Sequence, residues 1–542
     1  MGMIEKRKNM EAMMQILYKN GKILTMEDAY PLAEAVLIQN GRIKGVGKAE
    51  DLQQWMNAET EQVDLRGKTL IPAFVDAHSH LAAMANGLLQ VSLEESISFE
   101  QIGQQIQMFI KSQSLQPGQW IFAKGYDHNR LIEKRHPDRW KLDQWAPENP
   151  LVLQHQSGHV GVFNSAALRL LGVSGNIQSP DGGRIEMLNG EPTGYMEENA
   201  FMKYLQLAPM PDEESLMQAF AAAQQKYASY GITTIQEGLM SIQLMPIYQQ
   251  LLDRNLLKLD VVGYAGVEDY ETIAEAFPQS VHAYDRHFRL GGYKIFLDGS
   301  PQGRTAWMRS PYAGEPAGYC GYGTMQDADV AAAIKQSLEK KTQILAHCNG
   351  DAACAQYIRE IAKIYRENTS IARLRPVMIH AQFLGLDQLE EVKRCGIIPS
   401  FFVAHVYHWG EIHIQNFGKE RAGNISPAAS ALQKGIPFTF HQDAPVIQPD
   451  MMETIWCAVN RRTSMGTQLG RTQCISVSDA LKAVTQYAAY QYGEEAEKGS
   501  IAPGKLADFV LLEENPLEVK KEDLAQIKVL QTISRGETIY LR

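Results

Sequence analysis

A closely spaced pair of histidines gives the clearest chemical signal in this sequence. His78 and His80 stand at the end of the apolar run in IPAFVDAHSHL. Alternate residues of a β-strand face the same side, so both imidazoles can reach one metal ion. Taken alone, the pair is equally compatible with ordinary polar residues, and the choice depends on the rest of the chain.

Four further apolar segments carry residues able to bind a metal ion, and they follow the histidine pair in order. QILAHCNGD, RPVMIHAQ and IPFTFHQDAPV place His347, His380 and Asp443 at strand ends, and GGYKIFLDG contains Lys294. His441 shares a strand face with Asp443. A single histidine on an apolar strand is usually a hydrogen-bonded core residue, but an ordered series of such strand ends is hard to assign to chance.

Lys294 lies inside an apolar strand, where an ionised amine is costly to bury unless it is paired. One interpretation is a salt bridge, with Asp298 as the partner. The other is that the amine has reacted with CO₂ to form a carbamate, an anionic ligand able to bridge two cations. The residues alone leave both interpretations open.

These side chains have the composition that metal-assisted hydrolysis requires. Neutral imidazoles and carboxylates suit zinc and similar divalent ions. Metal binding lowers the pKa of water from about 15.7 to ~7, and a neighbouring carboxylate can pass the released proton to a leaving nitrogen. We therefore expect one or two divalent ions, zinc first, with Asp443 as the acid–base group and His380 as a second candidate.

The segments that must position these residues alternate between helix and strand patterns. DEESLMQAFAAAQQKYASYG precedes ITTIQEG, DADVAAAIKQSLEKK precedes QILAHCNGD, and PAASALQKG precedes IPFTFHQDAPV. Such alternation predicts a parallel α/β architecture, and a (β/α)₈ barrel places its active site at the carboxyl ends of the strands. The rhythm breaks between about residues 82 and 207, which indicates an insertion.

Short strand patterns occupy both ends of the chain. Asn20-Gly21 and Asn40-Gly41 fall between apolar alternations near the N-terminus, which is a hairpin signal. Similar short strand patterns occur near the C-terminus, in GKLADFVLLEENP and VLQTISRGETIYL. The two regions are therefore expected to pair into one small discontinuous β domain.

Composition indicates which partners and which cellular compartment are expected for the protein. The 542 residues carry a net charge of −10 without a basic run, so neither nucleic acid nor an anionic membrane is expected as partner. The six cysteines include no CxxC pair and are expected to be free thiols in a reducing compartment. Neither a secretory signal nor a run of ~20 apolar residues is recognised. We expect a cytoplasmic homo-oligomer, a dimer, that acts on a small molecule.

Taken together, VDAHSH, YKIF, LAHCNGD, MIHAQ and HQDAPV resemble the amidohydrolase superfamily, and most closely the branch that contains the N-substituted formamide deformylases. The similarity extends to GYDHNR, HVGVFNSAAL, GEPTGYMEE, DGSPQGRTA and GSIAPGKLADFVLL, and so spans nearly the whole chain. It implies a distorted (β/α)₈ TIM-type barrel over residues 71–490, with an inserted α/β segment at approximately 82–207. It also implies a discontinuous β-sandwich built from residues 1–70 and 491–542.

The resemblance also implies roles for individual residues. The implied metal ligands are His78, His80, His347, His380 and Asp443, with Lys294 at the position of a carboxylated lysine. His441 is a departure, because many relatives have serine there, and it is a candidate substrate contact. Further substrate-binding candidates are Tyr126, Asp127, His159, Asn164, Arg304 and His405. The alternative for the first four is that they hold the insertion together, and His405 could equally lie in an interface.

The sequence thus predicts a metal-dependent amidohydrolase that hydrolyses the C–N bond of an amide, formamide or cyclic amide. A deaminase or an ester-cleaving hydrolase on the same scaffold is an alternative, because fold does not fix substrate. A third alternative is a non-catalytic scaffold. Such a protein is expected to have lost metal ligands, whereas every expected position here carries a competent residue.

Overall fold

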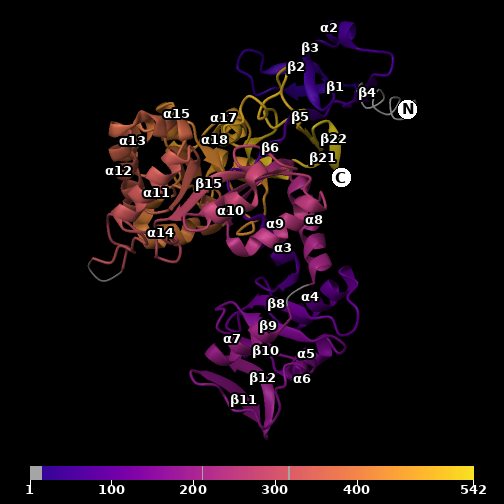
Figure 1. Cartoon of the computed structure of the whole chain (residues 1–542), viewed down its shortest axis with the longest axis vertical. Helices are drawn as coiled ribbons and strands as arrows, with labels where there is room; N and C mark the ends of the chain where they lie inside the picture. Colours follow the sequence, from indigo (N-terminus) through magenta and orange to yellow (C-terminus); the bar gives the residue numbers. More distant parts are fainter. Residues whose placement is uncertain (1–14, 210–211, 315–317) are drawn as a thin grey trace. The chain divides into compact units, whose positions relative to one another are not determined.

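The computed structural model describes residues 15–209, 212–314 and 318–542. The chain forms two compact units (Figure 1). The larger comprises the chain up to Ala82 together with Ala223–Arg542, and the smaller comprises Ala83–Ala222. In the described residues no helix is both long enough and apolar enough to cross a lipid bilayer.

The larger unit contains the predicted distorted barrel. Its sheet has eight strands, and each strand is parallel to the neighbour with which it pairs. Buried apolar residues such as Val262, Leu345 and Val377 form its core, as expected for parallel strands covered on both faces. In spatial order the strands are β6 (Phe74–Val75), β13 (Ile232–Met240), β14 (Asp260–Gly266), β15 (Phe288–Phe296), β16 (Gln343–Cys348), β17 (Val377–His380), β18 (Ile398–Phe401) and β19 (Thr439–Phe440).

Helices follow these strands along the chain and complete the α/β alternation. Helix α8 (Glu213–Ser229) ends before Gly231, and strand β13 begins directly after this glycine. Gly231 has a φ of 84°, the left-handed conformation that commonly terminates a helix. The helices of this unit that follow are α9 (Met245–Asp253), α10 (Tyr270–Ala276), α11 (Asp327–Glu339), α12 (Asp351–Glu367), α13 (Leu389–Arg394), α14 (His405–Gly423), α15 (Ala428–Gln433), α16 (Met451–Asn460), α17 (Val477–Ala483) and α18 (Gln486–Gln491).

The first and last barrel strands, β6 and β19, are joined by few backbone bonds. A parallel bridge links Ser79 with Ala444 beyond the strand ends. The buried side chain of Gln491 spans the remaining seam, where its Nε2 donates to the Ala77 carbonyl at 2.9 Å and its Oε1 accepts from the Thr439 hydroxyl at 2.8 Å. Side-chain hydrogen bonds thus take the place of part of the strand ladder at this seam.

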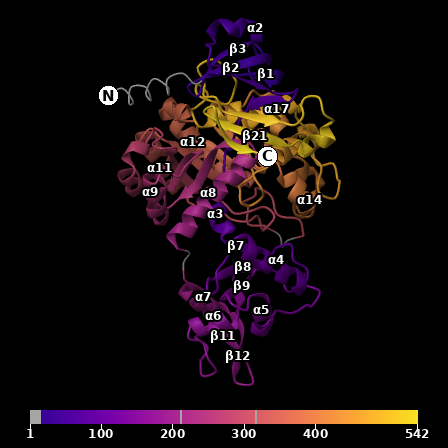
Figure 2. The ribbon, with the colours of Figure 1, turned by 90° about the vertical axis from the view of Figure 1, so that its right-hand side faces the viewer.

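Both ends of the chain contribute to one eight-stranded sheet, and their strands lie together in both views (Figures 1 and 2). The N-terminal strands are β1 (Gln15–Leu24), β2 (Leu32–Gln39), β3 (Arg42–Gly47), β4 (Glu61–Asp64) and β5 (Thr69–Pro72). The C-terminal strands are β20 (Phe509–Leu512), β21 (Val529–Ser534) and β22 (Glu537–Leu541). Strand β5 pairs with β1 on one edge and with β20 on the other, so it joins the two halves.

The two Asn-Gly pairs behave differently. Asn40 and Gly41, at φ of 52° and 74°, form the turn between β2 and β3, as predicted. The hairpin expected at Asn20-Gly21 is wrong, because both residues lie within β1 at an irregularity of its pairing with β2. A Cβ on Gly21 would lie 2.5 Å from the carbonyl oxygen of Lys68, so this glycine allows a close backbone approach instead.

A buried ionic cluster connects the barrel with this β domain. Asp260, at the start of β14, forms ion pairs with Lys498 at 2.7 Å and with Arg535 at 2.8 Å. His287 Nδ1 lies 2.7 Å from the same carboxylate. Arg535 lies between β21 and β22, and Lys498 precedes β20. The carboxylate is therefore held between residues distant in sequence.

The smaller unit has a six-stranded sheet in the order β11-β12-β10-β9-β8-β7, with separate apolar clusters around Trp145 and Phe201. Its strands are β7 (Gln90–Ser92), β8 (Ile121–Tyr126), β9 (Leu151–His155), β10 (Val160–Phe163), β11 (Gly183–Leu188) and β12 (Glu191–Glu197). Helix α4 (Phe99–Ser112) joins β7 to β8, and α5 (Arg139–Trp145) joins β8 to β9. These three strands are parallel, so this half of the insertion repeats an α/β pattern. Its other helices are α6 (Ser165–Leu170) and α7 (Glu198–Leu207), whereas α3 (Leu81–Leu88) and α8 (Glu213–Ser229) contain the points where the chain passes between the units.

Candidate metal centre

The predicted ligands come from the same edge of the barrel sheet, at or after the carboxyl ends of parallel strands. This is the edge at which barrel enzymes carry their active sites. His78 and His80 follow β6, Lys294 belongs to β15, His347 to β16 and His380 to β17, and Asp443 follows β19.

Three of these side chains form a compact group. The ligand atoms of His78, His380 and Asp443 all lie within 4.8 Å of one another. Asp443 Oδ1 is 3.4 Å from Nε2 of both His78 and His80, and its Oδ2 is 3.9 Å from His380 Nε2. These separations exceed the about 2.7–3.2 Å of an N–H···O hydrogen bond. They approach the about 3.3 Å expected between two ligands that each lie 2.0–2.1 Å from a tetrahedral ion.

The charge states of the group also suit a cation. Burial lowers the pKa of His78 and of His380 well below the usual histidine value, so both imidazoles are neutral. Burial acts to raise the pKa of Asp443, but the adjacent imidazoles of His80, His78 and His380 hold that pKa well below its usual range. Asp443 Oδ1 is buried and, among the residues that the structure describes, has no hydrogen-bond partner. Neutral imidazoles and an ionised, unpartnered carboxylate oxygen are what a divalent metal requires.

The backbone is strained at two of the three positions. His380 has a φ of 70° and Asp443 a φ of 53°, both in the left-handed region that residues with a Cβ rarely adopt. Such conformations persist only where the surrounding structure imposes them, and they cluster at functional sites.

Gln236, on β13, was not identified from the sequence as a site residue. Its Oε1 lies 2.5 Å from His78 Nδ1, and its Nε2 donates to the Ala77 carbonyl and to the Tyr492 hydroxyl, each at 3.0 Å. With the His78 proton on Nδ1, the Nε2 lone pair faces Asp443. Partners of this kind fix the tautomer and orientation of metal-binding histidines. The segment ITTIQEG predicts only a buried strand, and none of its residues indicates this role.

A glycine on the same strand makes room for the imidazoles. A Cβ on Gly238 would lie 2.7 Å from His78 Cε1 and 3.0 Å from His80 Cε1. Any side chain at this position would press on both rings, so the absence of one is a requirement of the site.

Lys294 is buried beside the group, and its Nζ is 3.4 Å from His78 Nε2. Burial lowers the pKa of its amine to about 8. Asp298 does not pair with it. That carboxylate accepts backbone N–H groups from Asn349 at 2.9 Å and Gly350 at 2.7 Å. Across residues 15–209, 212–314 and 318–542, Lys294 has no ion pair with a carboxylate, so the salt bridge considered from the sequence is not formed.

Two other histidines adjoin the group without joining it. The His347 ring lies 4.5 Å from that of His380, and its Nδ1 is 3.3 Å from Asp298 Oδ1. The His441 ring lies 5.2 Å from that of His78, and both of its nitrogens are buried with no hydrogen-bond partner in the part of the chain that the structure describes. Burial lowers the pKa of His441 to about 3, so it faces the centre as a neutral ring.

The remaining candidates of the larger unit have protein partners. His405 is buried, and its Nδ1 lies 3.0 Å from His413 Nε2. The Nε of Arg304 donates to Asn416 Oδ1 at 2.8 Å. Neither side chain belongs to the compact group around Asp443.

Three candidates of the smaller unit contact other residues of that unit. The Tyr126 hydroxyl is 2.9 Å from His136 Nδ1, and the exposed His159 pairs with Glu198 at 3.0 Å. Asn164 caps α6 and uses all four hydrogen-bonding positions of its amide. The Oδ1 atom accepts from Leu151 and Ala167, and the Nδ2 atom donates to Ala146 and Asn149. These four bonds favour the alternative considered from the sequence, in which Asn164 holds the insertion together.

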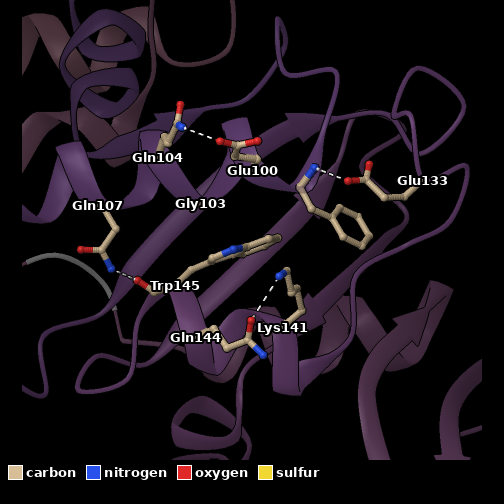
Figure 3. A pocket seen from close by; sticks show the side chains of 9 residues that line it. Glu100, Gly103, Gln104, Gln107, Glu133, Lys141, Gln144 and Trp145 are labelled. Carbon is tan, nitrogen blue, oxygen red and sulfur yellow. Dashed lines mark hydrogen bonds between the residues drawn. The ribbon is translucent and has the colours of Figure 1, made fainter.

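A pocket of about 590 Å³ lies between α4 and α5 of the smaller unit, and Figure 3 shows the indole of Trp145 among the side chains that line it. The remaining lining is mostly polar, with Gln104, Gln107, Lys141 and Gln144 among its residues. None of the predicted ligand or substrate residues lines it, so this pocket is separate from the metal centre.

Comparison with known proteins shows the family to which the chain belongs. The model described as "Amidohydrolase family" matches residues 61–540. The chain belongs to the amidohydrolase family. It is therefore a hydrolase of a metal-dependent family, as the sequence motifs predicted.

Two curated relatives match this amidohydrolase over nearly their whole lengths. YtcJ of Bacillus subtilis (strain 168) is 28% identical over 544 residues, which cover 97% of this chain and 99% of the relative. The N-substituted formamide deformylase of Arthrobacter pascens is 25% identical over 547 residues, which cover 98% of this chain and 99% of the relative.

Solved structures share the fold of this amidohydrolase. An uncharacterised metal-dependent hydrolase from Pyrococcus furiosus superposes with a TM-score of 0.74 at 23% identity, over 93% of this chain and 100% of that chain. A second, from Pyrococcus horikoshii OT3, has a TM-score of 0.75 at 23% identity, over 94% of this chain and 99% of that chain.

Proposed function

We propose that this amidohydrolase hydrolyses the C–N bond of a small amide, formamide or cyclic amide, with a zinc ion held by the strand-end histidines and Asp443. The observation that carries the proposal is Asp443 Oδ1. This buried atom lies 3.4 Å from the Nε2 atoms of His78 and His80, and within the described part of the chain it has no hydrogen-bond partner. The formamide class is suggested by the relative from Arthrobacter pascens.

The residues of the site divide the work of such a reaction. A divalent ion bound here supplies Lewis-acid activation of water. Asp443, kept ionised by its neighbours, accepts the proton that water releases and donates it to the leaving nitrogen. This transfer is needed because an amide anion is a very poor leaving group. His441, with two unpartnered nitrogens, is positioned to hydrogen-bond a polar atom of the substrate.

Lys294 extends the proposal to a second ion. The Lys294 amine is buried and lies 3.4 Å from His78 Nε2 without a carboxylate partner. A carbamate at Nζ would turn this amine into an anion and so remove the cost of an unpaired buried cation. We propose that Lys294 is carboxylated and that the site holds two ions.

The experiment that tests the function combines metal analysis with a substrate panel. The purified protein is assayed for bound zinc and for turnover of N-formyl amines, N-acyl amino acids, cyclic imides, aminated heterocycles and esters. We expect bound zinc, and hydrolysis of one of the first three classes. Full activity in a metal-free preparation would refute the metal role, and activity on heterocycles or esters alone would replace the C–N amide assignment.

The acid–base role of Asp443 is tested on the substrate found by the panel. Asp443→Asn keeps the shape and one oxygen but cannot shuttle a proton, so kcat should fall by ~10²–10⁴-fold while zinc is retained. Asp253→Asn, an exposed carboxylate on α9, is the matched control and should leave kcat unchanged. Near-normal turnover with zinc retained would remove Asp443 from the proton transfer.

A further inference from the structure

The smaller unit brings a second set of metal-binding side chains together. Strands β8 and β9 are parallel neighbours, and Tyr126 at the end of β8 lies opposite His155 at the end of β9. Asp127 and His128 follow β8 directly. Carboxyl ends of adjacent parallel strands are a common position for ligand sites in α/β folds. Here they place one carboxylate and two imidazoles at the same edge of the sheet.

The separations of these three side chains are those of metal ligands. His128 Nδ1 and His155 Nε2 are 3.2 Å apart, and Asp127 Oδ1 lies 3.5 Å from His155 Nε2 and 3.8 Å from His128 Nδ1. Both distances to the carboxylate are too long for a hydrogen bond of about 2.7–3.2 Å. All three lie close to the about 3.3 Å expected between ligands of one tetrahedral zinc ion. The centre in the barrel shows the same spacing, from 3.4 to 3.9 Å.

Neighbouring groups hold the carboxylate and one imidazole in place. Asp127 Oδ1 accepts the backbone N–H of Asn129 at 2.9 Å, and its Oδ2 accepts from Gln156 at 2.7 Å. His155 Nδ1 is 3.0 Å from the Ser157 hydroxyl. If Nδ1–H donates to that hydroxyl, the lone pair of His155 Nε2 is left for a metal, which is the usual arrangement for a histidine ligand.

The second imidazole is fixed by stacking and borders an open space. The rings of His128 and His136 lie 4.1 Å apart at 31°, and His136 Nδ1 is 2.9 Å from the Tyr126 hydroxyl. Both histidines line a pocket of about 670 Å³ within the same unit. An ion with three protein ligands would therefore have room for a fourth, exchangeable ligand.

We infer that Asp127, His128 and His155 form a second divalent metal site, for zinc or an ion of similar preference, within the inserted unit. The competing arrangement is a metal-free hydrogen-bonded cluster. In that arrangement the backbone N–H of Ser157, 3.1 Å away, donates to His155 Nδ1, and Nε2–H of His155 donates to His128 Nδ1 at 3.2 Å. The inference is independent of the proposed function, because all three ligands belong to the smaller unit.

The test measures zinc on the full chain after the barrel centre has been removed. In a His78→Ala/His80→Ala background, metal-free protein is titrated with Zn²⁺ by calorimetry, and its zinc content is measured after dialysis. We expect one remaining equivalent. Adding His128→Ala and His155→Ala should abolish it, whereas adding His159→Ala, an exposed histidine of the same unit, should leave it in place.

A second variant guards against loss of folding. Asp127→Asn keeps the size of the side chain, and it should weaken zinc binding by at least tenfold while the circular dichroism spectrum stays unchanged. Cobalt substitution in the same background should give visible d–d absorption that disappears in the variants at the three ligands. Failure of the background protein to bind zinc, or zinc binding that survives both sets of substitutions, would overturn the inference.

Discussion

Replacing Gln236 by leucine should weaken metal binding without removing a ligand. Leucine has nearly the same volume, so the change mainly deletes the acceptor 2.5 Å from His78 Nδ1 and the donor to Ala77 and Tyr492. His78 then loses the partner that directs its Nε2 lone pair toward Asp443. Loss of such a partner typically lowers metal affinity by about 10–100-fold, or about 1.4–2.7 kcal/mol.

The assay is competition for zinc between metal-free protein and a chromophoric chelator. We expect Gln236→Leu to raise the Kd for zinc by about 10–100-fold, and Gln236→Glu, which keeps an acceptor, to restore most of the affinity. Gln356→Leu is the control, because Gln356 is equally buried but bonds Met325 and Asp327 beside α11. Wild-type affinity in Gln236→Leu would refute the orienting role, and an equal loss in the control would assign the effect to general destabilisation.

Three further predictions concern other parts of the larger unit. Lys294→Ala should remove a ¹³C carbamate resonance that appears in wild-type protein supplied with labelled bicarbonate, and its absence from wild type would exclude carboxylation. Gly238→Ala should displace His78 and reduce zinc content, measured by elemental analysis at unchanged secondary structure. Burial acts to raise the pKa of Asp260, but Lys498 and its other partners hold it well below its usual range. The stability that this ionised carboxylate contributes to the fold is therefore present above about pH 4 and lost as pH falls further. Asp260→Asn should therefore make the melting temperature, Tm, depend less on pH in the acid range. Lys498→Met should lower the free energy of unfolding by about 3–5 kcal/mol at neutral pH.

The fold was accessible from the sequence because its signals are periodic and repeated. Amphipathic helices before buried strands, as in the segments that became α8–β13 and α11–β16, predict a parallel barrel whatever the details of packing. The similar strand patterns at the two ends of the chain likewise indicated one shared β domain. Ligand candidates at strand ends followed, because the architecture fixes where such ends lie.

The features that were missed depend on tertiary contacts. Gln236 acquires its role only because β13 lies beside the loop that carries His78, and a glutamine in a strand has no local signature. Asn20-Gly21 has the composition of a hairpin turn, but pairing of β1 with three other strands outweighs that local preference. Asn164 belongs to a motif shared with the family, and its four hydrogen bonds within the insertion could not be predicted from that motif.

The place of β5 has a consequence for synthesis of the chain. Its edge opposite β1 is paired only by β20, and about 430 residues are made between these two strands. At the ~5–20 residues per second of translation, that edge waits about 20–90 s for its partner. An unpaired apolar edge is a template for association with other chains. The nascent protein should therefore be most prone to aggregate, and most dependent on chaperones, while its barrel is still being translated.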